Sequence, residues 1–426
     1  MTQKKRYNFK LDWFILSIYF CLVIFGYFNV FSALSGTEIS SYLDISKPHG
    51  KQLIFIVVSA FLIVIIFALD TKIYERYASI IYVLSLISLI GLFVFGKRIN
   101  GALSWYDLGG MTIQPGEFAK FATTLALAKY ISDLQTDIKA YKHQFRSSLI
   151  VIIPSLLILM QNDAGTSIIF AALIFVLFRE GIPQKYIYIG FSILLIIIGT
   201  LKFSALYLCL FCFLLLLIYK LFYYRKKKKF LSTILLYISL SLLSFSTEWS
   251  FENILRPHHQ NRISLWLKIE KDPTKIEAMK QDISYNLNES IKAIRAGGLV
   301  GKGFNQGTRT RGKFVPEQHT DYIFSTVAEE WGFLGSSLVI ILFVALIARI
   351  ITLADQHTSQ FSRAYGYGVA SVIFLHFLIN IGMVMGLIPT IGIPLPLFSY
   401  GGSGLISFTI LIFVFLKLDA NRLSAW

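Results

Sequence analysis

The sequence predicts an all-α, polytopic integral membrane protein, and three observations support this. The chain has 426 residues and a mean hydropathy of +0.64. Hydrophobic residues make up 55% of it and charged residues 15%, whereas soluble domains carry about 25% charged residues. The hydrophobic residues fall in long uninterrupted runs, as in membrane spans. Much of the formal net charge of +16 lies in short loops between these runs, as the positive-inside rule requires.

Twelve apolar runs are interpreted as transmembrane helices that follow a basic, cytoplasmic N-terminus. They cover residues 13–34, 52–69, 77–95, 115–132, 147–160, 166–178, two spans within 186–222, 230–247, 322–351, 364–387 and 399–418. Basic connections at 70–76, 133–146, 179–185 and 223–229 place these loops, and the C-terminal tail, on the cytoplasmic side. The runs 147–160 and 166–178 are short, and they form either short spans or a re-entrant pair.

Residues 248–320 follow the ninth span and therefore form one large extracytoplasmic loop within a single membrane domain, 1–426. The last part of this loop, 291–313, has no acidic residue, and its glycines permit backbone conformations that bind anions. It is either a solvated basic loop or a binding site for a lipid diphosphate. Its basic residues are Lys292, Arg295, Lys302, Arg309, Arg311 and Lys313.

A short polar run stands directly before the tenth apolar run, where ionisable groups are costly. It reads Glu317, Gln318, His319, Thr320 and Asp321. One interpretation is an N-cap, in which the side chain of Thr320 or Asp321 accepts from free N–H groups of the following helix. The other is a reactive site at the mouth of the span.

Glu117 and Lys120 are three residues apart, so they lie on one helical face and can form an ion pair. Such a pair near a helix start is either structural or part of a site. Trp105, in the preceding external loop, is either an interfacial aromatic residue or a site residue.

Two further stretches carry polar or irregular sequence at membrane depth. Glu329 and Glu330, early in the tenth span, could face a cavity or pair with basic residues such as Lys120 or Arg363. The stretch 380–404 contains three prolines that forbid one straight helix. It is either a tight loop or irregular backbone that lines a cavity.

Together these stretches resemble the SEDS family (shape, elongation, division and sporulation), membrane proteins that polymerise peptidoglycan. Four motifs match the family in order. They are NGALSWYDLGGMTIQPGEFAK, QNDAGTS, AIRAGGLVGKG with FVPEQHTDYIFS and EEWG, and NIGMVMGLIPTIGIPLPLFSYGGSG. The wording of the first and third motifs is more similar to the elongation branch, RodA, than to the division branch, FtsW. The family usually has ten spans, and the surplus pair falls between residues 179 and 247.

The resemblance implies which residues form the site. The family's essential aspartate falls on Asp321, which is the implied catalytic residue. The implied substrate-binding residues are Trp105, Glu117, Lys120, Asp163, Arg262 and Lys302, with Glu317, His319 and Thr320 beside the aspartate.

We therefore expect an inverting glycosyltransferase that joins lipid II, a lipid-linked disaccharide, into β-1,4 glycan outside the cytoplasmic membrane of a bacterium. Asp321 would act as general base on the acceptor hydroxyl. Basic residues such as Lys302 and Arg262 would neutralise the diphosphate leaving group. A divalent cation, Mg or Mn, could share that task, but no ligand cluster specifies one, and no other cofactor is expected.

The resemblance also implies partners. These are a class B penicillin-binding protein, which is a transpeptidase, other membrane proteins of the elongation complex, and membrane lipid. Nucleic acid is not expected. Two alternative functions are a flippase for lipid-linked precursors, which would not need Asp321 as a base, and a non-catalytic scaffold for the transpeptidase.

Overall fold

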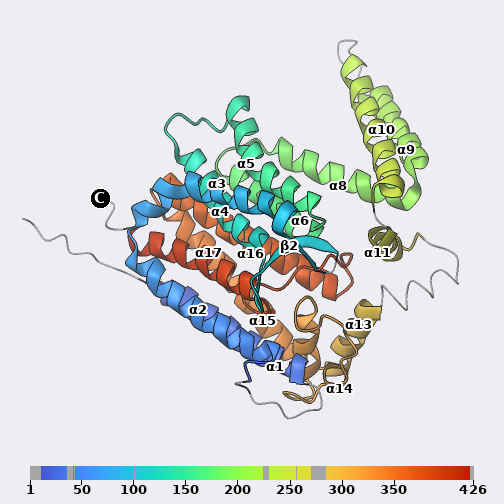
Figure 1. The fold of residues 1–426 in the computed structure, drawn as a ribbon. Coiled ribbons are helices and arrows are strands. Elements are labelled where there is room, and N and C mark those ends of the chain that lie inside the picture. Colours follow the sequence, from blue (N-terminus) through green and yellow to red (C-terminus); the bar gives the residue numbers. More distant parts are fainter. Residues whose placement is uncertain are drawn as a thin grey trace, which may run out of the picture. The chain divides into compact units, whose positions relative to one another are not determined.

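The computed structural model describes residues 11–35, 42, 44–99, 101–223, 230–255, 257–269 and 285–422. Within these residues the protein is almost entirely helical (Figure 1). The chain divides into two compact units. The first comprises Met1–Ile182, Asn288–Leu387 and Ile391–Trp426, and the second comprises Pro183–Leu287 and Ile388–Thr390.

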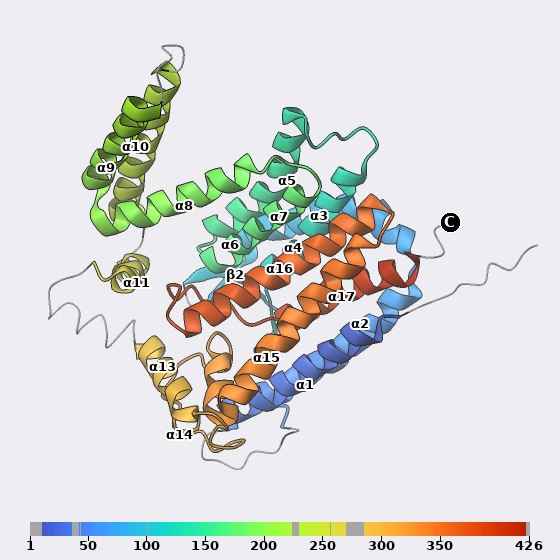
Figure 2. The ribbon, with the colours of Figure 1, turned by 180° about the vertical axis from the view of Figure 1, so that it is seen from behind.

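The first unit is a bundle of long helices with short helical pieces between them. Its helices are α1 (Trp13–Ser35), α2 (Pro48–Ala68), α3 (Thr71–Phe95), α4 (Pro115–Ser132), α5 (Tyr141–Met160), α6 (Ala164–Ile169), the 3₁₀ helix η1 (Phe170–Leu173), α7 (Ile174–Arg179), α13 (Tyr285–Gly297, most of which belongs to this unit), α14 (Thr308–Arg311), α15 (Ile323–Asp355), α16 (Gln360–Val384) and α17 (Gly402–Ala420). Figure 2 shows α15 between α1 and α16, and both pairs are in contact. The apolar windows of α16 and α17 are 72% and 83% buried, so polar residues on these two helices mostly face protein rather than lipid.

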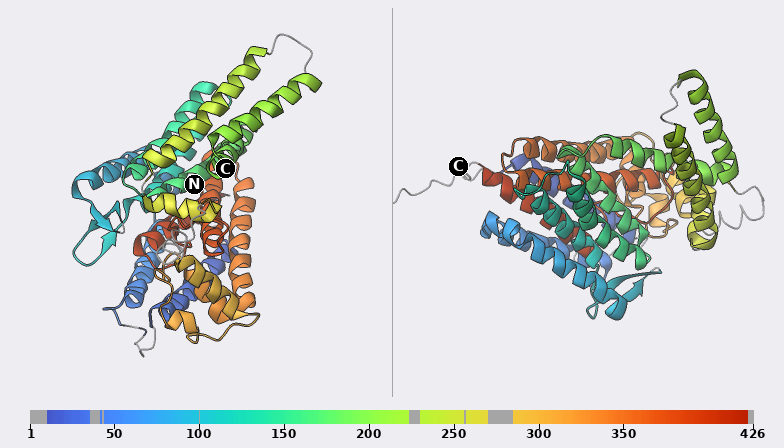
Figure 3. Two further views of the ribbon diagram at one scale, coloured as in Figure 1. Left: turned by 90° about the vertical axis from the view of Figure 1, so that its right-hand side faces the viewer. Right: turned by 90° about the horizontal axis from the view of Figure 1, so that it is seen from above.

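A small antiparallel sheet joins α3 to α4 in the stretch that the sequence presented as a loop. Its strands are β1 (Lys97–Ile99), β2 (Ala102–Asp107) and β3 (Thr112–Ile113), in that order. Gly109 and Gly110 turn the chain between β2 and β3 with φ angles of 75° and 115°, which glycine adopts readily. Figure 3 shows the sheet, in cyan, at the edge of the helical bundle. Strands this short leave little periodic pattern in a sequence.

The second unit contains α8 (Lys185–Phe203), α9 (Ala205–Tyr223), α10 (Phe230–Asn253) and α11 (Pro257–Leu267). The predicted division of 186–222 into two helices is confirmed, with the break at Ser204, whose φ is 67°. α9 and α10 pack along each other, and both contact α8. The backbone N–H of Ala205 donates to a carboxylate oxygen of Glu248 on α10 (3.3 Å), which ties the start of α9 to its neighbour.

Nine helices of the described part of the chain are long and apolar enough to cross a membrane, so the protein is a multi-pass integral membrane protein. They are α1, α2, α3, α5, α8, most of α10, α15, α16 and α17. Helices also occupy the other three predicted positions, but these helices are too short or too polar to count as membrane-spanning. The apolar helices at Ala164–Arg179 and Ala205–Ile218 are shorter. α4 carries Glu117, Lys120 and Lys129 and is mostly buried, so surrounding protein shields it from lipid.

Candidate functional site

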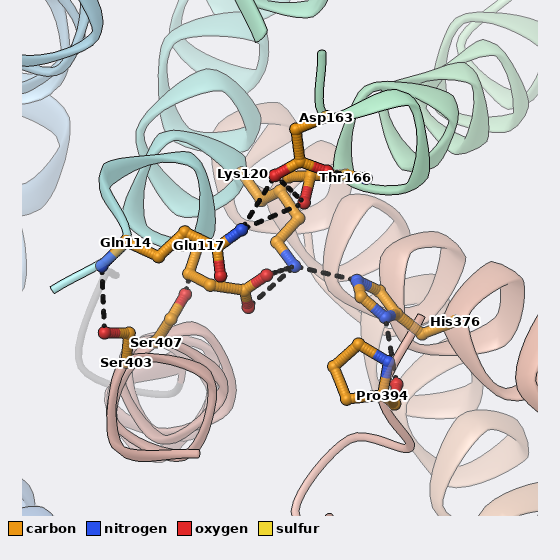
Figure 4. A network of polar contacts seen from close by, with 9 residues as sticks. All are labelled: Gln114, Glu117, Lys120, Asp163, Thr166, His376, Pro394, Ser403 and Ser407. Carbon is orange, nitrogen blue, oxygen red and sulfur yellow. Dashed lines mark hydrogen bonds and ion pairs between the residues drawn. The ribbon is translucent and has the colours of Figure 1, made fainter. Parts of the chain in front are cut away.

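Glu117 and Lys120 form a buried ion pair in the first two turns of α4, as their spacing predicted (Figure 4). Pro115 begins this helix, where a missing N–H costs nothing. The Lys120 Nζ lies 2.8 Å from each carboxylate oxygen of Glu117. The two residues are only 2% and 3% exposed, so the charges neutralise each other inside the protein. Ser407 on α17 donates to the Glu117 carbonyl (2.6 Å).

His376 on α16 completes this cluster. Its Nε2 lies 2.7 Å from the Lys120 Nζ. A lysine ammonium has three donors and no acceptor, so Nε2 accepts and the proton of the neutral ring sits on Nδ1. Nδ1 faces the carbonyl oxygen of Pro394 at 3.4 Å. All three donors of Lys120 therefore have partners, and the Phe408 ring covers the ammonium at 4.9 Å.

Asp163 connects the beginnings of α4 and α6. It is the N-cap of α6, and its side chain accepts from the Thr166 N–H (3.0 Å) and from the Thr166 hydroxyl (3.0 Å). It also accepts from the side-chain amide of Gln114, the residue just before α4 (2.8 Å). These contacts join the starts of two helices, and the substrate-binding role that the resemblance implies for Asp163 would add to them.

The polar run before α15 forms a tight turn. The N–H groups of Thr320 and Asp321 both donate to the carbonyl of Glu317, at 3.2 Å and 3.1 Å. The Thr320 hydroxyl also donates to this carbonyl (3.1 Å). The N-cap of α15 is Tyr322, so neither residue named in the capping alternative occupies the cap position.

The loop between α16 and α17, together with Asn380 on the last turns of α16, holds the carbonyl groups of residues 319–321 with one bond each. The backbone N–H of Tyr400 donates to the first (2.9 Å), the Ser399 hydroxyl to the second (2.5 Å) and the Asn380 amide to the third (2.9 Å). Residues 385–401 contain no helix, as their prolines predicted. This irregular backbone therefore supports the polar run.

The side chains of the polar run are partly enclosed. The His319 ring lies 5.5 Å from the Tyr400 ring. Burial lowers the pKa of His319, although the nearby Glu317 carboxylate acts in the opposite direction, so the imidazole is neutral at pH 7. The Asp321 side chain faces Gly392, because a Cβ added to Gly392 would lie 3.2 Å from the Asp321 Oδ2.

A second buried carboxylate, Glu329 on α15, anchors the basic segment, which comprises residues 291–313. Its Oε1 accepts from the Lys302 ammonium (2.8 Å) and the Arg309 N–H (3.0 Å). Its Oε2 accepts from the N–H and the hydroxyl of Thr310, at 2.9 Å and 2.8 Å. Because Glu329 is fully buried, these bonds replace its hydration.

Glu329 pairs with a basic residue, as one alternative predicted, but the partner is Lys302 rather than Lys120 or Arg363. Lys120 pairs with Glu117, and Arg363 pairs with Glu180 (2.9 Å). α15 and α16 are joined by a short turn and packed together. The first turn of α16, with Arg363, therefore meets the last turns of α15, about 30 Å from its two glutamates. Glu330 instead accepts from the Ser32 hydroxyl on α1.

Backbone bonds also hold the basic segment on α15. The N–H groups of Lys302 and Gly303 donate to the carbonyls of Glu329 and Glu330, at 3.0 Å and 2.9 Å. These carbonyls are available because α15 is interrupted at Gly332, where φ is 64° and ψ is −158°. Such a conformation is essentially restricted to glycine.

Two of the predicted site residues take part in none of the contacts described above. Trp105 lies on β2, opposite Lys97 on β1. Arg262 belongs to the second unit, where its guanidinium donates to the Thr390 carbonyl (3.2 Å). In the described ranges, no three His, Cys, Asp or Glu side chains gather closely enough to hold a metal ion.

Sequence reasoning missed His376 and Asn380. They are four residues apart, so they lie on one face of α16. The available signal was an ionisable and an amide side chain within one apolar run, since polar groups at that depth are costly and are often functional.

This arrangement defines a class of protein, a multi-pass membrane protein with buried, paired charges beside a carboxylate-bearing turn. A family model for cell cycle proteins of the FtsW, RodA and SpoVE type matches residues 12–209 and 201–423. The peptidoglycan glycosyltransferase MrdB of Escherichia coli K12 is 30% identical over 399 residues, which cover 93% of this chain and 90% of MrdB.

Solved structures show the same fold. A peptidoglycan synthase complex that coordinates polymerisation and crosslinking contains a chain with a TM-score of 0.70 and 24% identity, with 97% of this chain and 98% of that chain covered. The rod shape determining protein RodA of Thermus thermophilus gives a TM-score of 0.62 at 22% identity, with 97% of each chain covered. The chain belongs to the SEDS family of peptidoglycan glycosyltransferases, as its motifs indicated.

Proposed function

We propose that this chain polymerises lipid II into β-1,4 glycan for cell elongation, with Asp321 as the general base. The observation that carries this proposal is the way in which the turn that contains Asp321 is held in place. Three donors from outside the turn hold its successive carbonyls. A base must be held within hydrogen-bond reach of the hydroxyl that it deprotonates. A turn fixed in this way suits that task.

In the proposed reaction, the Asp321 carboxylate takes the proton from the acceptor sugar's hydroxyl. The oxygen of that hydroxyl forms a bond to the donor's anomeric carbon, and the bond to the lipid diphosphate breaks. The diphosphate leaves with the bonding electrons, and nearby cations stabilise its charge. The anomeric centre is inverted because a single displacement occurs.

Cations of the basic segment would receive the leaving group. Lys302 uses two of its three donors on Glu329 and Thr308, which leaves one for a phosphate oxygen. Arg262, Trp105, Glu117, Lys120 and Asp163 complete the proposed substrate-binding set, with Glu317, His319 and Thr320 beside the base. A divalent cation that arrives with the diphosphate is an alternative, and polymerisation in the presence of a chelator tests it.

The proposed topology has twelve crossings in a single membrane domain, with both termini cytoplasmic. Residues 248–320 then form the extracytoplasmic loop, and the site faces outward from a bacterial cytoplasmic membrane. Helices occupy all twelve predicted positions, and basic connections mark the inner side. The surplus helix pair relative to the family's usual ten lies between 179 and 247.

The proposed partner is a class B penicillin-binding protein, together with other membrane proteins of the elongation complex. One structure of similar fold comes from a complex that combines polymerisation with crosslinking. Freshly made glycan must be crosslinked, so a transpeptidase bound next to the polymerase would receive its substrate directly. Co-purification of the two proteins from detergent-solubilised membranes tests this.

The deciding experiment compares purified wild-type protein with Asp321→Asn, each given labelled lipid II. We expect polymer from the wild type and a loss of ~10²-fold or more in the variant, because asparagine keeps the shape but cannot take a proton. Equal insertion and equal thermal stability are the controls. Normal polymer from the variant would remove Asp321 from the mechanism. Translocation without polymer from the wild type would indicate a flippase, and neither activity would indicate a scaffold.

A further inference from the structure

Asn380 occupies a point where two separate carbonyl groups converge. Its Nδ2 donates to the carbonyl of Asp321 (2.9 Å) and to the carbonyl of Ile393 (2.7 Å). Both partners are acceptors, so only the NH₂ group can serve both, and this fixes the orientation of the amide. Asn380 is fully buried, so bulk water cannot replace either bond. One side chain therefore joins the backbone of Asp321 to the loop after α16.

His376 holds the next residue of the same loop. It lies one turn before Asn380 on the same face of α16, and its Nδ1 faces the carbonyl of Pro394 while its Nε2 faces Lys120. Two successive carbonyls of the loop, those of Ile393 and Pro394, are thus held from one helix. Together these contacts form a continuous path from the ion pair on α4 to Asp321.

Side chains from α16 hold the loop at Ile393 and Pro394, whereas the loop's own bonds lie further on, between Leu395 and Ser399. Pro394 and Pro396 have no N–H to donate. The neighbouring Gly392 backbone fits closely against α6, since a Cβ added to Gly165 would lie 3.2 Å from the Gly392 carbonyl oxygen. Gly392 also borders the Asp321 carboxylate. A shift of this loop would therefore move both the backbone and the side-chain surroundings of Asp321.

We propose that Asn380 is a positioning residue for Asp321 and that His376 assists it by bracing the loop, an inference that rests on the function proposed for Asp321. Neither side chain takes the proton. They hold the carboxylate where the acceptor hydroxyl arrives. Misplacement of a reacting group by about 1 Å costs on the order of 10²-fold in rate, whereas affinity for lipid II depends on other residues.

The first test replaces Asn380 with leucine, which has a similar size and no donor. We expect kcat to fall ~10- to 100-fold, with KM for lipid II changed by less than about twofold. Added to Asp321→Asn, it should cause no further loss of the residual rate, because residues that act as a unit are not additive. Ser371→Ala is the matched control, since Ser371 is also buried in α16 and is absent from this network.

Two variants separate the roles of His376. Asparagine keeps a donor close to the Nδ1 position, whereas glutamine keeps an acceptor close to the Nε2 position. If His376 braces the loop, His376→Asn should retain a higher kcat than His376→Gln. The reverse order would show that His376 acts through Lys120, and it would remove His376 from the proposal.

Hydrogen exchange provides a readout apart from activity. Peptides that cover 317–322 and 391–396 should exchange faster in Asn380→Leu and should be unchanged in Ser371→Ala. If Asp321→Asn polymerises normally, the proposed function fails, and the positioning role fails with it. If Asp321→Asn is inactive but Asn380→Leu keeps a normal kcat, or its loss multiplies with that of Asp321→Asn, only the positioning role is wrong.

Discussion

At the scale of single residues, burial decides what each charged group can do. Glu117, Lys120 and Glu329 are nearly or fully inaccessible, and each is matched by partners of opposite charge or by hydrogen-bond donors. A buried charge that loses its partner is costly, whereas a neutral pair of similar shape is tolerated. The sequence could predict that Glu117 and Lys120 pair, because they are near in the chain. It could not predict the Glu329 partners, because only the fold brings residues 302–310 to α15.

This difference gives a test of whether the Glu117–Lys120 pair is structural or functional. We expect Lys120→Met to lower the free energy of unfolding by about 3–5 kcal/mol, because it leaves a buried carboxylate uncompensated. Adding Glu117→Gln should restore most of that loss, as thermal unfolding in detergent micelles would show. If the pair also binds substrate, the double variant remains inactive although it is stable. Full polymerisation by the stable double variant would limit the pair to a structural role.

At the scale of elements, the basic segment is held on α15 by close backbone packing. A Cβ added to Gly301 would lie 2.2 Å from the Glu330 carbonyl oxygen, whereas a Cβ added to Gly298 would meet nothing within 4 Å. Both glycines have positive φ angles, 86° and 55°. The sequence predicted that these glycines permit unusual backbone conformations. It could not predict that one of them packs against a helix, because that packing depends on the interruption at Gly332.

We therefore expect Gly301→Ala to release the basic segment and Gly298→Ala to leave it in place. The penalty for alanine at positive φ, about 1–2 kcal/mol, is common to both variants, and only Gly301 adds the clash. Limited trypsin digestion should cut Gly301→Ala much faster after Lys302 and Arg309 than it cuts Gly298→Ala. Equal cleavage of the two variants would show that close packing at Gly301 does not hold the segment.

At the scale of the whole molecule, the apolar runs predicted the positions of the helices more accurately than they predicted which helices cross the membrane. Helices occupy every predicted position, but α4 is too polar to meet the measure for a span because protein surrounds it. The small sheet was not foreseen, because its pairing depends on strands of two to six residues. The contact between Glu117 and Lys120 was predicted from their spacing, whereas the contacts of His376 and Asn380 required the folded arrangement.

The proposed topology is tested by introduced cysteines in a chain whose three native cysteines are replaced by alanine. Gln306 is exposed, so Gln306→Cys should react with a membrane-impermeant thiol reagent in intact cells. Lys142, exposed in a loop predicted to be cytoplasmic, should react only after permeabilisation. Gln318 is 3% exposed, so Gln318→Cys should stay unreactive although the proposed topology places it on the outer side. Labelling of Lys142→Cys but not of Gln306→Cys in intact cells would invert the topology.

The interruption of α15 at Gly332 also separates two parts of the helix that differ in exposure. Before it stand the buried Glu329 and Glu330, and directly after it Phe333 and Leu334 are 62% and 63% exposed. From there to Asp355 the helix is roughly 35 Å long, enough to cross a hydrocarbon core of about 30 Å by itself. An amphiphile whose tail lies beside Phe333 would thus present its water-soluble head to the level of the glutamates. Gly332 therefore separates the part of α15 that is long enough to cross the hydrocarbon core from the part that carries the two buried glutamates.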